Sequence, residues 1–167
     1  MTETIKPQIG GLEPKYGFII NPYPDYRASS CPFCGRKTGQ RKLPLLVNVN
    51  KLDFVILNYT CRYCKDCDVL IAHKHEIEHL LTVLFQQRDP ELIGSDYLVF
   101  GTMDKETWRE GSKHETTKTI KEIVSHLSDF TTYYKELRMT QQGWYLKGKR
   151  PPIRKPPASQ EWVKSER

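Results

Sequence analysis

The sequence has no apolar stretch long enough to cross a lipid bilayer. Its longest apolar runs are Phe54–Leu57, Val69–Ala72 and Leu80–Phe85, whereas a membrane-spanning helix needs about 20 apolar residues. The N-terminal residues MTETIKPQIGG also lack the basic start and the apolar core of a secretory signal. We therefore expect no membrane partner and a cytoplasmic protein, in a reducing intracellular environment.

Several common catalytic motifs are missing as well. The sequence contains no G-x-S-x-G motif, no glycine-rich phosphate loop and no Walker lysine. Hydrophobic residues make up 38% and charged residues 28% of the 167 positions, so the chain can bury only a modest core. This length and composition indicate one domain, or one domain with a small appendage.

Positive charge is concentrated in two places. The net charge is +6, and residues 141–167 alone contain seven basic and two acidic residues, so the rest of the chain is nearly neutral. A second group of basic residues lies between Arg27 and Lys51, with no acidic residue among them. Such patches suit phosphates, but they also suit acidic proteins or solubility alone. The candidate nucleic-acid contacts are Arg36, Lys37, Arg41, Lys42, Lys147, Lys149, Arg150, Arg154 and Lys155.

Five cysteines lie in the middle of the chain, in two closely spaced motifs. These are Cys31-Pro-Phe-Cys34-Gly and Cys61-Arg-Tyr-Cys64-Lys-Asp-Cys67-Asp. A Cys-x-x-Cys turn supplies two thiolates, and four thiolates form the tetrahedral ligand set that structural zinc prefers. In a chain without an export signal, paired cysteines indicate metal binding rather than disulfides. We therefore predict one structural zinc ion.

The second motif leaves open which two of its cysteines bind the metal. Cys64 and Cys67 are the preferred pair, because Asp68 can adopt the left-handed turn conformation that follows the second thiolate. The alternative pair is Cys61 and Cys64, with Lys65 in the less suitable turn position. The cysteine left over is then a small buried residue, or a redox trigger beside the metal.

The segment from about residue 29 to residue 73 resembles the zinc-ribbon proteins. The resemblance rests on the CPxCG pattern of the first knuckle, which Cys31-Pro32-Phe33-Cys34-Gly35 matches fully. The three cysteines of the second knuckle depart from the family pattern. The resemblance implies a structural zinc ion and a role in binding nucleic acid or in docking within a larger assembly, and it implies no particular enzymatic activity.

Composition and apolar spacing divide the chain into four segments. Residues 1–30 are predicted to be an extended lead-in, 31–74 the zinc ribbon, 75–140 a helical or α+β body, and 141–167 a basic, proline-rich tail. The tail is expected to be disordered or bound to the surface of the body, because charged and proline-rich segments bury too little apolar surface to fold alone.

The predicted fold class is α+β, with a three-stranded zinc-ribbon sheet packed against two to three helices. Strands are predicted over Leu43–Asn48, Phe54–Thr60, Asp68–His73 and Tyr97–Thr102. The strand at Tyr97 would extend the sheet or pair with the lead-in. Helices are predicted over 75–88, Lys105–Glu110 and 113–138.

One motif points to an enzyme. His75-Glu76-Ile77-Glu78-His79 matches the H-E-x-x-H helix of zinc metallopeptidases, in which two histidines bind zinc and the glutamate is the general base. Here both histidines are expected opposite the apolar side of the helix, and therefore in water. No further histidine follows at the expected distance, and only Glu91 and Asp96 are available as a third ligand. The peptidase is thus an outlier hypothesis.

Two classes of function are compatible with these features. The first is a non-enzymatic zinc-ribbon protein that binds nucleic acid, either DNA or RNA, or a ribonucleoprotein, with the basic loop and tail on phosphates. The second is a protein–protein adaptor subunit of a larger complex. Trp144 and Tyr145 can stack on exposed bases next to cationic side chains, or they can instead pin the tail to the body.

Overall fold

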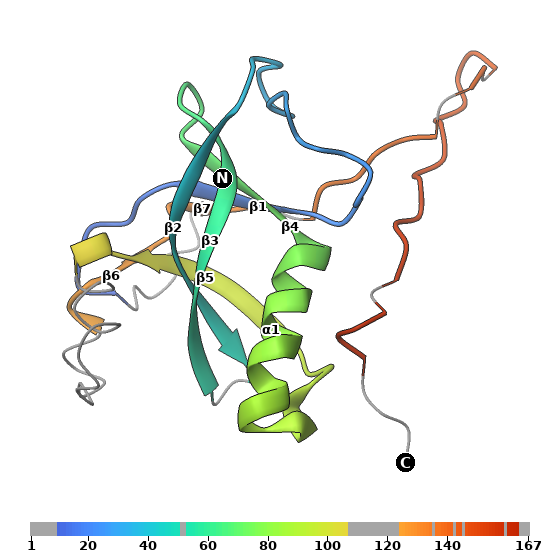
Figure 1. Cartoon of the computed structure of the whole chain (residues 1–167). Helices are drawn as coiled ribbons and strands as arrows, with labels where there is room; N and C mark the ends of the chain where they lie inside the picture. Colours follow the sequence, from blue (N-terminus) through green and yellow to red (C-terminus); the bar gives the residue numbers. More distant parts are fainter. Residues whose placement is uncertain are drawn as a thin grey trace.

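The computed structural model describes residues 10–50, 53–106, 124–134, 136–141, 143–144, 146–158 and 160–163. In this part of the chain, seven strands form one sheet, and one α-helix of several turns, α1 (Lys74–Arg88), packs against it (Figure 1). A short 3-10 helix, η1 (Pro90–Leu92), follows α1. No helix within the described ranges has the length and hydropathy needed to cross a bilayer.

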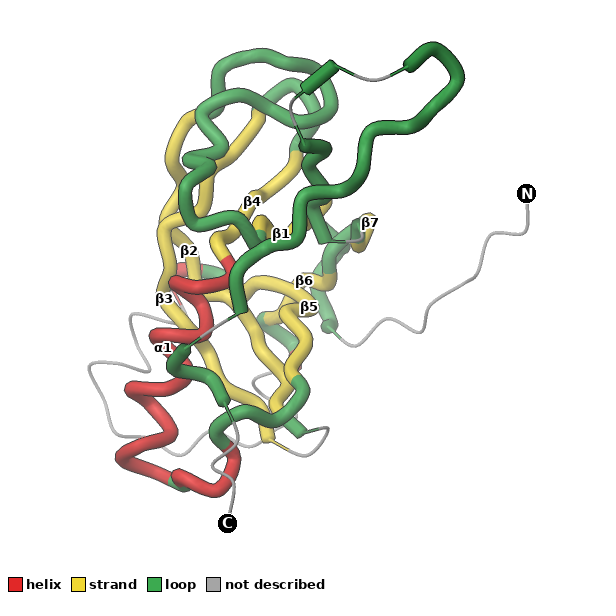
Figure 2. The backbone as a smooth tube through the Cα atoms, turned by 90° about the vertical axis from the view of Figure 1, so that its right-hand side faces the viewer, coloured by secondary structure: helices red, strands yellow, loops and turns green. Residues whose placement is uncertain are grey.

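The strands lie side by side in the order β6-β5-β2-β3-β4-β1-β7. Their bounds are β1 Gly17–Asn21, β2 Gly39–Val49, β3 Asp53–Cys64, β4 Val69–His73, β5 Tyr97–Met103, β6 Leu127–Asp129 and β7 Thr132–Tyr133. Neighbouring strands are antiparallel, except that β1 runs parallel to both β4 and β7. Figure 2 shows the curved strands as one layer with α1 on one side of it.

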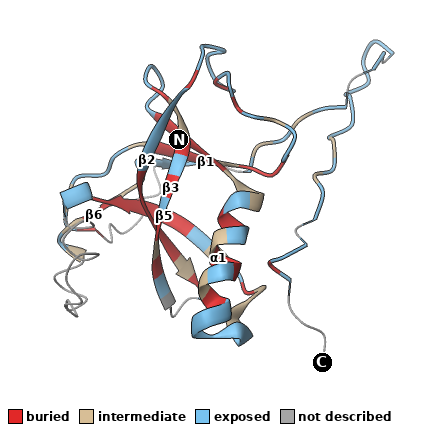
Figure 3. Cartoon of the chain, viewed as in Figure 1, coloured by how far each residue is buried: buried red, intermediate tan, exposed pale blue. Residues whose placement is uncertain are grey.

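The main core lies between the sheet and α1. Successive side chains of a strand point to opposite faces, and β2 buries its odd-numbered residues Leu43, Leu45, Val47 and Val49. From the helix, the residues that enter the same cluster most deeply are Ile77, Leu81 and Phe85. The other side of α1 is exposed or half-buried (Figure 3). Burial of apolar surface stabilises a fold by about 25 cal/mol per Å², so this cluster is the main source of stability.

The sheet curls because two short strands, adjacent in sequence, complete its two opposite edges. β6 pairs with β5 and β7 pairs with β1, and only Phe130 and Thr131 separate them. The backbone N–H of Phe130 donates to Phe100 O at 3.1 Å, and that of Thr131 donates to Tyr16 O at 2.8 Å. Gly101 permits the close approach of β6, since a Cβ there would lie 2.4 Å from the Ser128 carbonyl oxygen. The result is a half-barrel rather than a flat ribbon.

The prediction of four strands and of the first helix is confirmed. β2, β3, β4 and β5 overlap the predicted ranges, and α1 begins one residue before the predicted helix over 75–88. The strand at Tyr97 extends the sheet by pairing with β2, not with the lead-in. The lead-in itself supplies β1, which pairs in parallel with β4. The fold is α+β as expected, with a larger sheet than the three strands predicted.

The prediction of two to three helices is wrong for the described part of the chain. Residues 107–123 lie outside the described residues, and with them most of the predicted helix Lys105–Glu110 and the first half of the helix over 113–138. From Leu127 onward the second half is strand and loop, not helix. Leu127 and Phe130 fit a helical period, but the backbone groups of this segment pair with the open edges of the sheet, which favours extended chain.

The described residues of the tail contradict disorder and fit the other alternative, a segment bound to the body. Trp162 is only 8% exposed, and its ring lies 5.9 Å from that of Phe85 in the main core. Its Nε1–H donates to Ser95 O at 2.8 Å. Nearer its start, the tail folds back on itself through a β-bridge between Thr140 and Ile153. A single buried tryptophan removes a large apolar area from water. The charged, proline-rich composition of the whole tail gave no indication that this one residue is buried.

Candidate metal centre and adjoining surfaces

Four cysteine thiols meet where β3 ends. The Sγ atoms of Cys31, Cys34, Cys64 and Cys67 all lie within 4.8 Å of one another. The Cys31–Cys67 separation is 3.9 Å and the Cys34–Cys64 separation is 3.6 Å. Sulfur atoms at the corners of a tetrahedron with Zn–S bonds of about 2.3 Å lie about 3.8 Å apart. The arrangement therefore suits a single metal ion, and it unites the four cysteines preferred from the sequence.

In both knuckles the residue after the second cysteine has a left-handed backbone conformation. Gly35, directly after Cys34, has φ +75°, and Asp68, directly after Cys67, has φ +54°. In the first knuckle the Gly35 N–H donates to Cys31 O at 2.9 Å. Left-handed φ values are uncommon outside glycine, although aspartate adopts them more readily than most residues. The predicted turn conformation of Asp68 is thus confirmed.

A polar anchor holds the first knuckle against β3. The Thr38 hydroxyl donates to Ala28 O at 2.6 Å, and Thr38 is buried. From β3, the Arg62 Nε donates to Thr38 Oγ1 at 3.1 Å and Arg62 Nη2 donates to Thr38 O at 2.7 Å. Because Arg62 precedes Cys64 by two residues, the same stretch of β3 positions both knuckles.

Cys61 takes no part in the cluster. It is buried in the main core, whereas Cys64 packs with Cys31 in a separate cluster that includes Ile19 and Ile71. Burial raises the pKa of Cys61 far above its ordinary value. A deeply buried thiol in apolar surroundings is unreactive, so Cys61 acts as a small core residue.

The four clustered thiols do not ionise together easily. Interaction with the Cys34 thiol, followed by desolvation, raises the pKa of Cys67 to about 12. Burial likewise raises the pKa of Cys31. For Cys64, desolvation opposes ionisation, but hydrogen bonds from the Cys67 backbone and from the neighbouring thiols outweigh it and lower the pKa. A bound dication replaces the protons of the thiols and stabilises all four thiolates.

The basic residues of the first knuckle have different surroundings. Arg36 Nη1 lies 3.1 Å from Asp66 Oδ1, so this ion pair joins the two knuckles. The Arg41 guanidinium lies 4.2 Å from the centre of the Tyr63 ring, and its Nη1 donates to the Tyr16 hydroxyl at 2.8 Å. The side chains of Lys37 and Lys42 are exposed. Two of the four predicted contacts, Arg36 and Arg41, thus interact within the chain, and phosphate contact by this loop stays a prediction.

In the tail, one arginine is engaged and the other candidates are exposed. Arg154 Nη2 lies 2.7 Å from Asp25 Oδ2, and its guanidinium lies 5.3 Å from the centre of the Tyr23 ring. The hydrogen bond from Arg154 lowers the pKa of Asp25. Exposed basic residues of the tail are Lys147, Lys149, Arg150 and Lys155. Arg154 thus anchors the tail to the body. Trp144 is 84% exposed, and Tyr145 lies outside the described residues.

The H-E-x-x-H residues lie on the first turns of α1 and do not assemble a metal site. His75 Nε2 lies 3.2 Å from the Pro157 carbonyl oxygen, and His79 Nδ1 lies 2.8 Å from Glu161 Oε2. Both histidines are on the outer side of the helix, as predicted, but the tail crosses them. Among the residues that the structure describes, the four cysteines are the only group that brings three or more possible metal ligands together, so neither Glu91 nor Asp96 completes a site.

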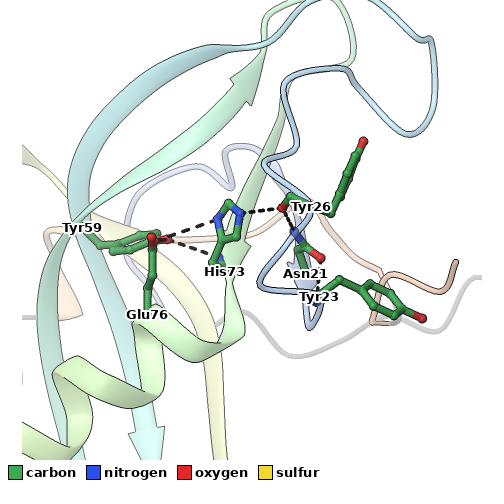
Figure 4. Close-up of polar contacts among 6 residues, drawn as sticks. All are labelled: Asn21, Tyr23, Tyr26, Tyr59, His73 and Glu76. Atoms are coloured by element: carbon green, nitrogen blue, oxygen red, sulfur yellow. Dashed lines mark hydrogen bonds and ion pairs between the residues drawn. The ribbon is translucent and has the colours of Figure 1, made fainter. Parts of the chain in front are cut away.

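Glu76 joins a hydrogen-bonded network instead (Figure 4). The Tyr59 hydroxyl donates to Glu76 Oε2, and the His73 backbone N–H donates to the Tyr59 hydroxyl oxygen at 3.2 Å. The His73 ring places Nδ1 4.0 Å from Glu76 Oε2 and Nε2 2.9 Å from the Tyr26 carbonyl oxygen. Burial, then the hydrogen bond to Glu76, raise the pKa of Tyr59 far above its ordinary value. The network fixes the start of α1 against β3 and the lead-in.

A polar groove of about 990 Å³ lies beside this network. Even-numbered positions of β2 and β3 line it with Gln40, Lys42, Asn58, Thr60 and Arg62. The rest of its lining includes Arg27, His73, His75, Glu76 and His79. Sequence reasoning identified only Lys42 as a candidate contact here. On β3 the polar even positions alternate with the hydrophobic odd positions Leu57, Tyr59 and Cys61, and this alternation could have revealed the groove.

Comparison with known proteins yielded no match: no protein-family model, no curated protein and no solved structure corresponds to this chain. The cluster of four cysteines is consistent with a zinc site, and it identifies no family.

Proposed function

We propose that the protein is a non-enzymatic, zinc-stabilised module that binds the sugar-phosphate backbone of single-stranded nucleic acid in the polar groove. One zinc ion, held by Cys31, Cys34, Cys64 and Cys67, has a structural role. Four thiolates around zinc leave no open coordination position for a substrate, which is typical of structural rather than catalytic sites.

The observation that carries the proposal is the composition of the groove wall. Arg27, Lys42 and Arg62 bring three permanent positive charges to the groove, against the single carboxylate of Glu76. Arg27 and Lys42 are exposed, so phosphates can reach them without breaking the fold. Arginine and lysine supply the backbone contacts that position a nucleic acid.

Uncharged side chains of the same wall can contact bases. Gln40, Asn58 and Thr60 lie among the cationic residues of β2 and β3, and their amide and hydroxyl groups can both donate and accept hydrogen bonds. Single strands expose base edges that such groups can reach. This interleaving of charge and hydrogen-bonding capacity favours a polynucleotide over an isolated phosphate.

The metal centre supports the groove mechanically. Arg62 contributes to the groove wall and, through Thr38, holds the first knuckle, while Cys64 lies two residues further along β3. Metal binding in such sites is coupled to folding. Loss of zinc is therefore expected to disorder the knuckles and to weaken nucleic-acid binding through Arg62.

The test is fluorescence anisotropy with labelled oligo-dT and oligo-U at several salt concentrations. Reversing two groove charges in Arg27→Glu/Lys42→Glu should weaken binding at least tenfold, and should reduce the slope of log affinity against log salt by roughly 0.7 for each phosphate that the variant no longer neutralises. The control is Arg88→Glu, at the far end of α1 and outside the groove. Equal affinity of the groove variant and the control, or no binding by the parent protein, would overturn the proposal.

A protein–protein adaptor is the second candidate, and one observation favours it. Trp144 is 84% exposed, and it shares the loop closed by the Thr140–Ile153 bridge with Leu146 and Ile153, each more than half exposed. Exposed tryptophans are frequent anchors of protein interfaces. If affinity capture retains a protein partner that Trp144→Ala releases while the groove variant does not, the adaptor function is supported.

A further inference from the structure

A second cavity, of about 640 Å³, lies on the other side of α1 from the polar groove. From the helix it receives Lys74 and Glu78, whereas the groove receives His75, Glu76 and His79. At 100° per residue these two sets lie on different sides of the helix. The cavity therefore lies between α1, β5 and the C-terminal tail, and it is separate from the surface assigned to nucleic acid.

Glu78 is the unusual residue of this cavity. It is only 3% exposed, although it carries an ionisable carboxyl group. Its Oε2 accepts a hydrogen bond from the Tyr97 hydroxyl at 2.7 Å, whereas its buried Oε1 has no hydrogen-bond partner in the described structure. Buried carboxylates without a donor are unfavourable, so this oxygen has unused capacity to accept a hydrogen bond from a ligand.

Aromatic rings form the wall next to Glu78. Tyr97, Tyr133 and Trp162 all line the cavity, and the Tyr97 and Trp162 rings lie 6.1 Å apart at 87°. The hydrogen bond from Trp162 Nε1 to Ser95 O fixes the indole in place. Burial raises the pKa of Tyr133 to about 12, and burial together with Glu78 raises the pKa of Tyr97 and keeps it protonated. Neutral aromatic rings attract cations through their faces.

The charges around the cavity also favour a cation. Its lining contains three carboxylate residues, Glu78, Asp96 and Glu136, and one lysine, Lys74. Lys74 Nζ already lies 3.7 Å from Glu136 Oε1, so its charge is largely offset. Two negative charges remain, one of them buried beside aromatic rings.

We propose that this cavity binds an alkylammonium group that carries at least one N–H, such as the side chain of a lysine or a free aliphatic diamine. The ammonium donates to Glu78 Oε1, and its carbon chain lies against Trp162 and Tyr97. A quaternary ammonium has no N–H to offer and binds more weakly here. Glu78 recognises the charge and the donor, and the aromatic wall recognises the adjoining methylene groups.

The test follows the Trp162 indole N–H signal in the NMR spectrum of the zinc-loaded full chain, assigned with Trp162→Phe. The probes are n-butylammonium, its neutral counterpart n-butanol, and tetramethylammonium. Butylammonium should bind at least tenfold more tightly than either of the other two. Glu78→Gln should abolish that preference, since a charge-assisted hydrogen bond is lost. The control Glu91→Gln makes the same charge change outside the cavity and should leave the preference intact.

Two further arms complete the experiment. If n-butanol binds the parent protein and Glu78→Gln equally weakly, the cavity is still folded in the variant. Loss of the preference for butylammonium then results from the lost charge of Glu78. Putrescine and Nα-acetyl-lysine methylamide distinguish a free amine from a protein lysine by their relative affinities. Equal binding of butylammonium and butanol, undetectable binding of butylammonium, or an unchanged preference in Glu78→Gln would refute the proposal, whatever the outcome for the polar groove.

Discussion

Cys61 and Cys64 lie three residues apart on β3, and their side chains lie on opposite faces of the sheet. Cys61 is 1% exposed in the core beneath α1, while Cys64 is equally buried beside Cys31 on the other face. Side chains in a strand alternate between faces, so an odd spacing cannot place two cysteines in one metal site while both stay in the strand. Only the pair that spans the turn, Cys64 and Cys67, reaches the first knuckle.

Substitution of single cysteines should distinguish the zinc ligands from the cysteine of the core. One zinc ion per chain is expected in the parent protein and in Cys61→Ala, whereas Cys67→Ser should lose it, because a tetrahedral site without one thiolate binds zinc far more weakly. Structural zinc contributes on the order of 10 kcal/mol to folding, so the ribbon of Cys67→Ser should unfold. Metal analysis and circular dichroism with a chelator measure both effects. Zinc retained by Cys67→Ser but lost from Cys61→Ala would contradict the assignment.

Truncation of the buried tail tryptophan should destabilise the whole fold. Trp162→Ala removes the packing against Phe85 and Tyr97 and leaves a cavity, so the free energy of unfolding should fall by about 3 kcal/mol. Trp144→Ala is the matched control, because its 84% exposed ring has little packing to lose, and it should change stability by less than about 0.5 kcal/mol. Urea unfolding followed by circular dichroism gives both values. Equal stability of the two variants would mean that the tail is not docked in solution.

Alkaline pH should destabilise the protein through tyrosines whose pKa values are raised in the folded state. The pKa values of Tyr63 and Tyr133 are raised to about 12, in both cases first by burial, against about 10 in an unfolded chain. Because the folded state holds these protons more tightly, their stabilising effect is complete below pH 10 and is lost as the pH rises from about 10 to 12. Tyrosinate absorbance and circular dichroism should therefore change together in that window. Titration of all tyrosines near pH 10 with the fold intact would disprove this.

The histidine motif should be dispensable for metal binding. His79→Ala should leave zinc at one ion per chain, since the four cysteines already supply every ligand. The ion pair of His79 with Glu161 is about half exposed, and exposed pairs contribute about 0–1 kcal/mol, so the melting temperature should change little. A second equivalent of zinc that disappears in His79→Ala would revive the metallopeptidase hypothesis.

The strands around the cysteines could be predicted because local signals agree there. Leu43, Leu45, Val47 and Val49 of β2 share the buried face beneath α1, the turn near Asn50 has a left-handed residue, and the apolar spacing of α1 is helical. Metal-ligand spacing is also local, which is why four of the five cysteines could be assigned to one cluster. The alternation of side chains along β3 excludes Cys61 from the metal site, because the strand continues to Cys64. The predicted strand ended at Thr60, so this argument did not follow from the sequence.

Long-range pairing is what the sequence did not reveal. β6 and β7 contain three and two residues, and they are strands only because β5 and β1 offer open edges to them. Glu78 is a charged residue of α1, yet it is buried, and Tyr97, distant in sequence, supplies a hydroxyl donor to it. In the same way Trp162 lies in a segment whose composition is typical of disorder, and its docking site on Phe85 is distant in sequence.

Closure of the sheet by residues 127–134 has a consequence during synthesis on the ribosome. A nascent chain that ends near Met103 already contains β1 to β5, but the outer edges of β5 and β1 then have no partner strand from the described chain. Open strand edges pair readily with other chains. Incomplete chains are therefore expected to recruit chaperones or to associate with one another, and the protein becomes safe from such association only when its C-terminal segment emerges and seals both edges at once.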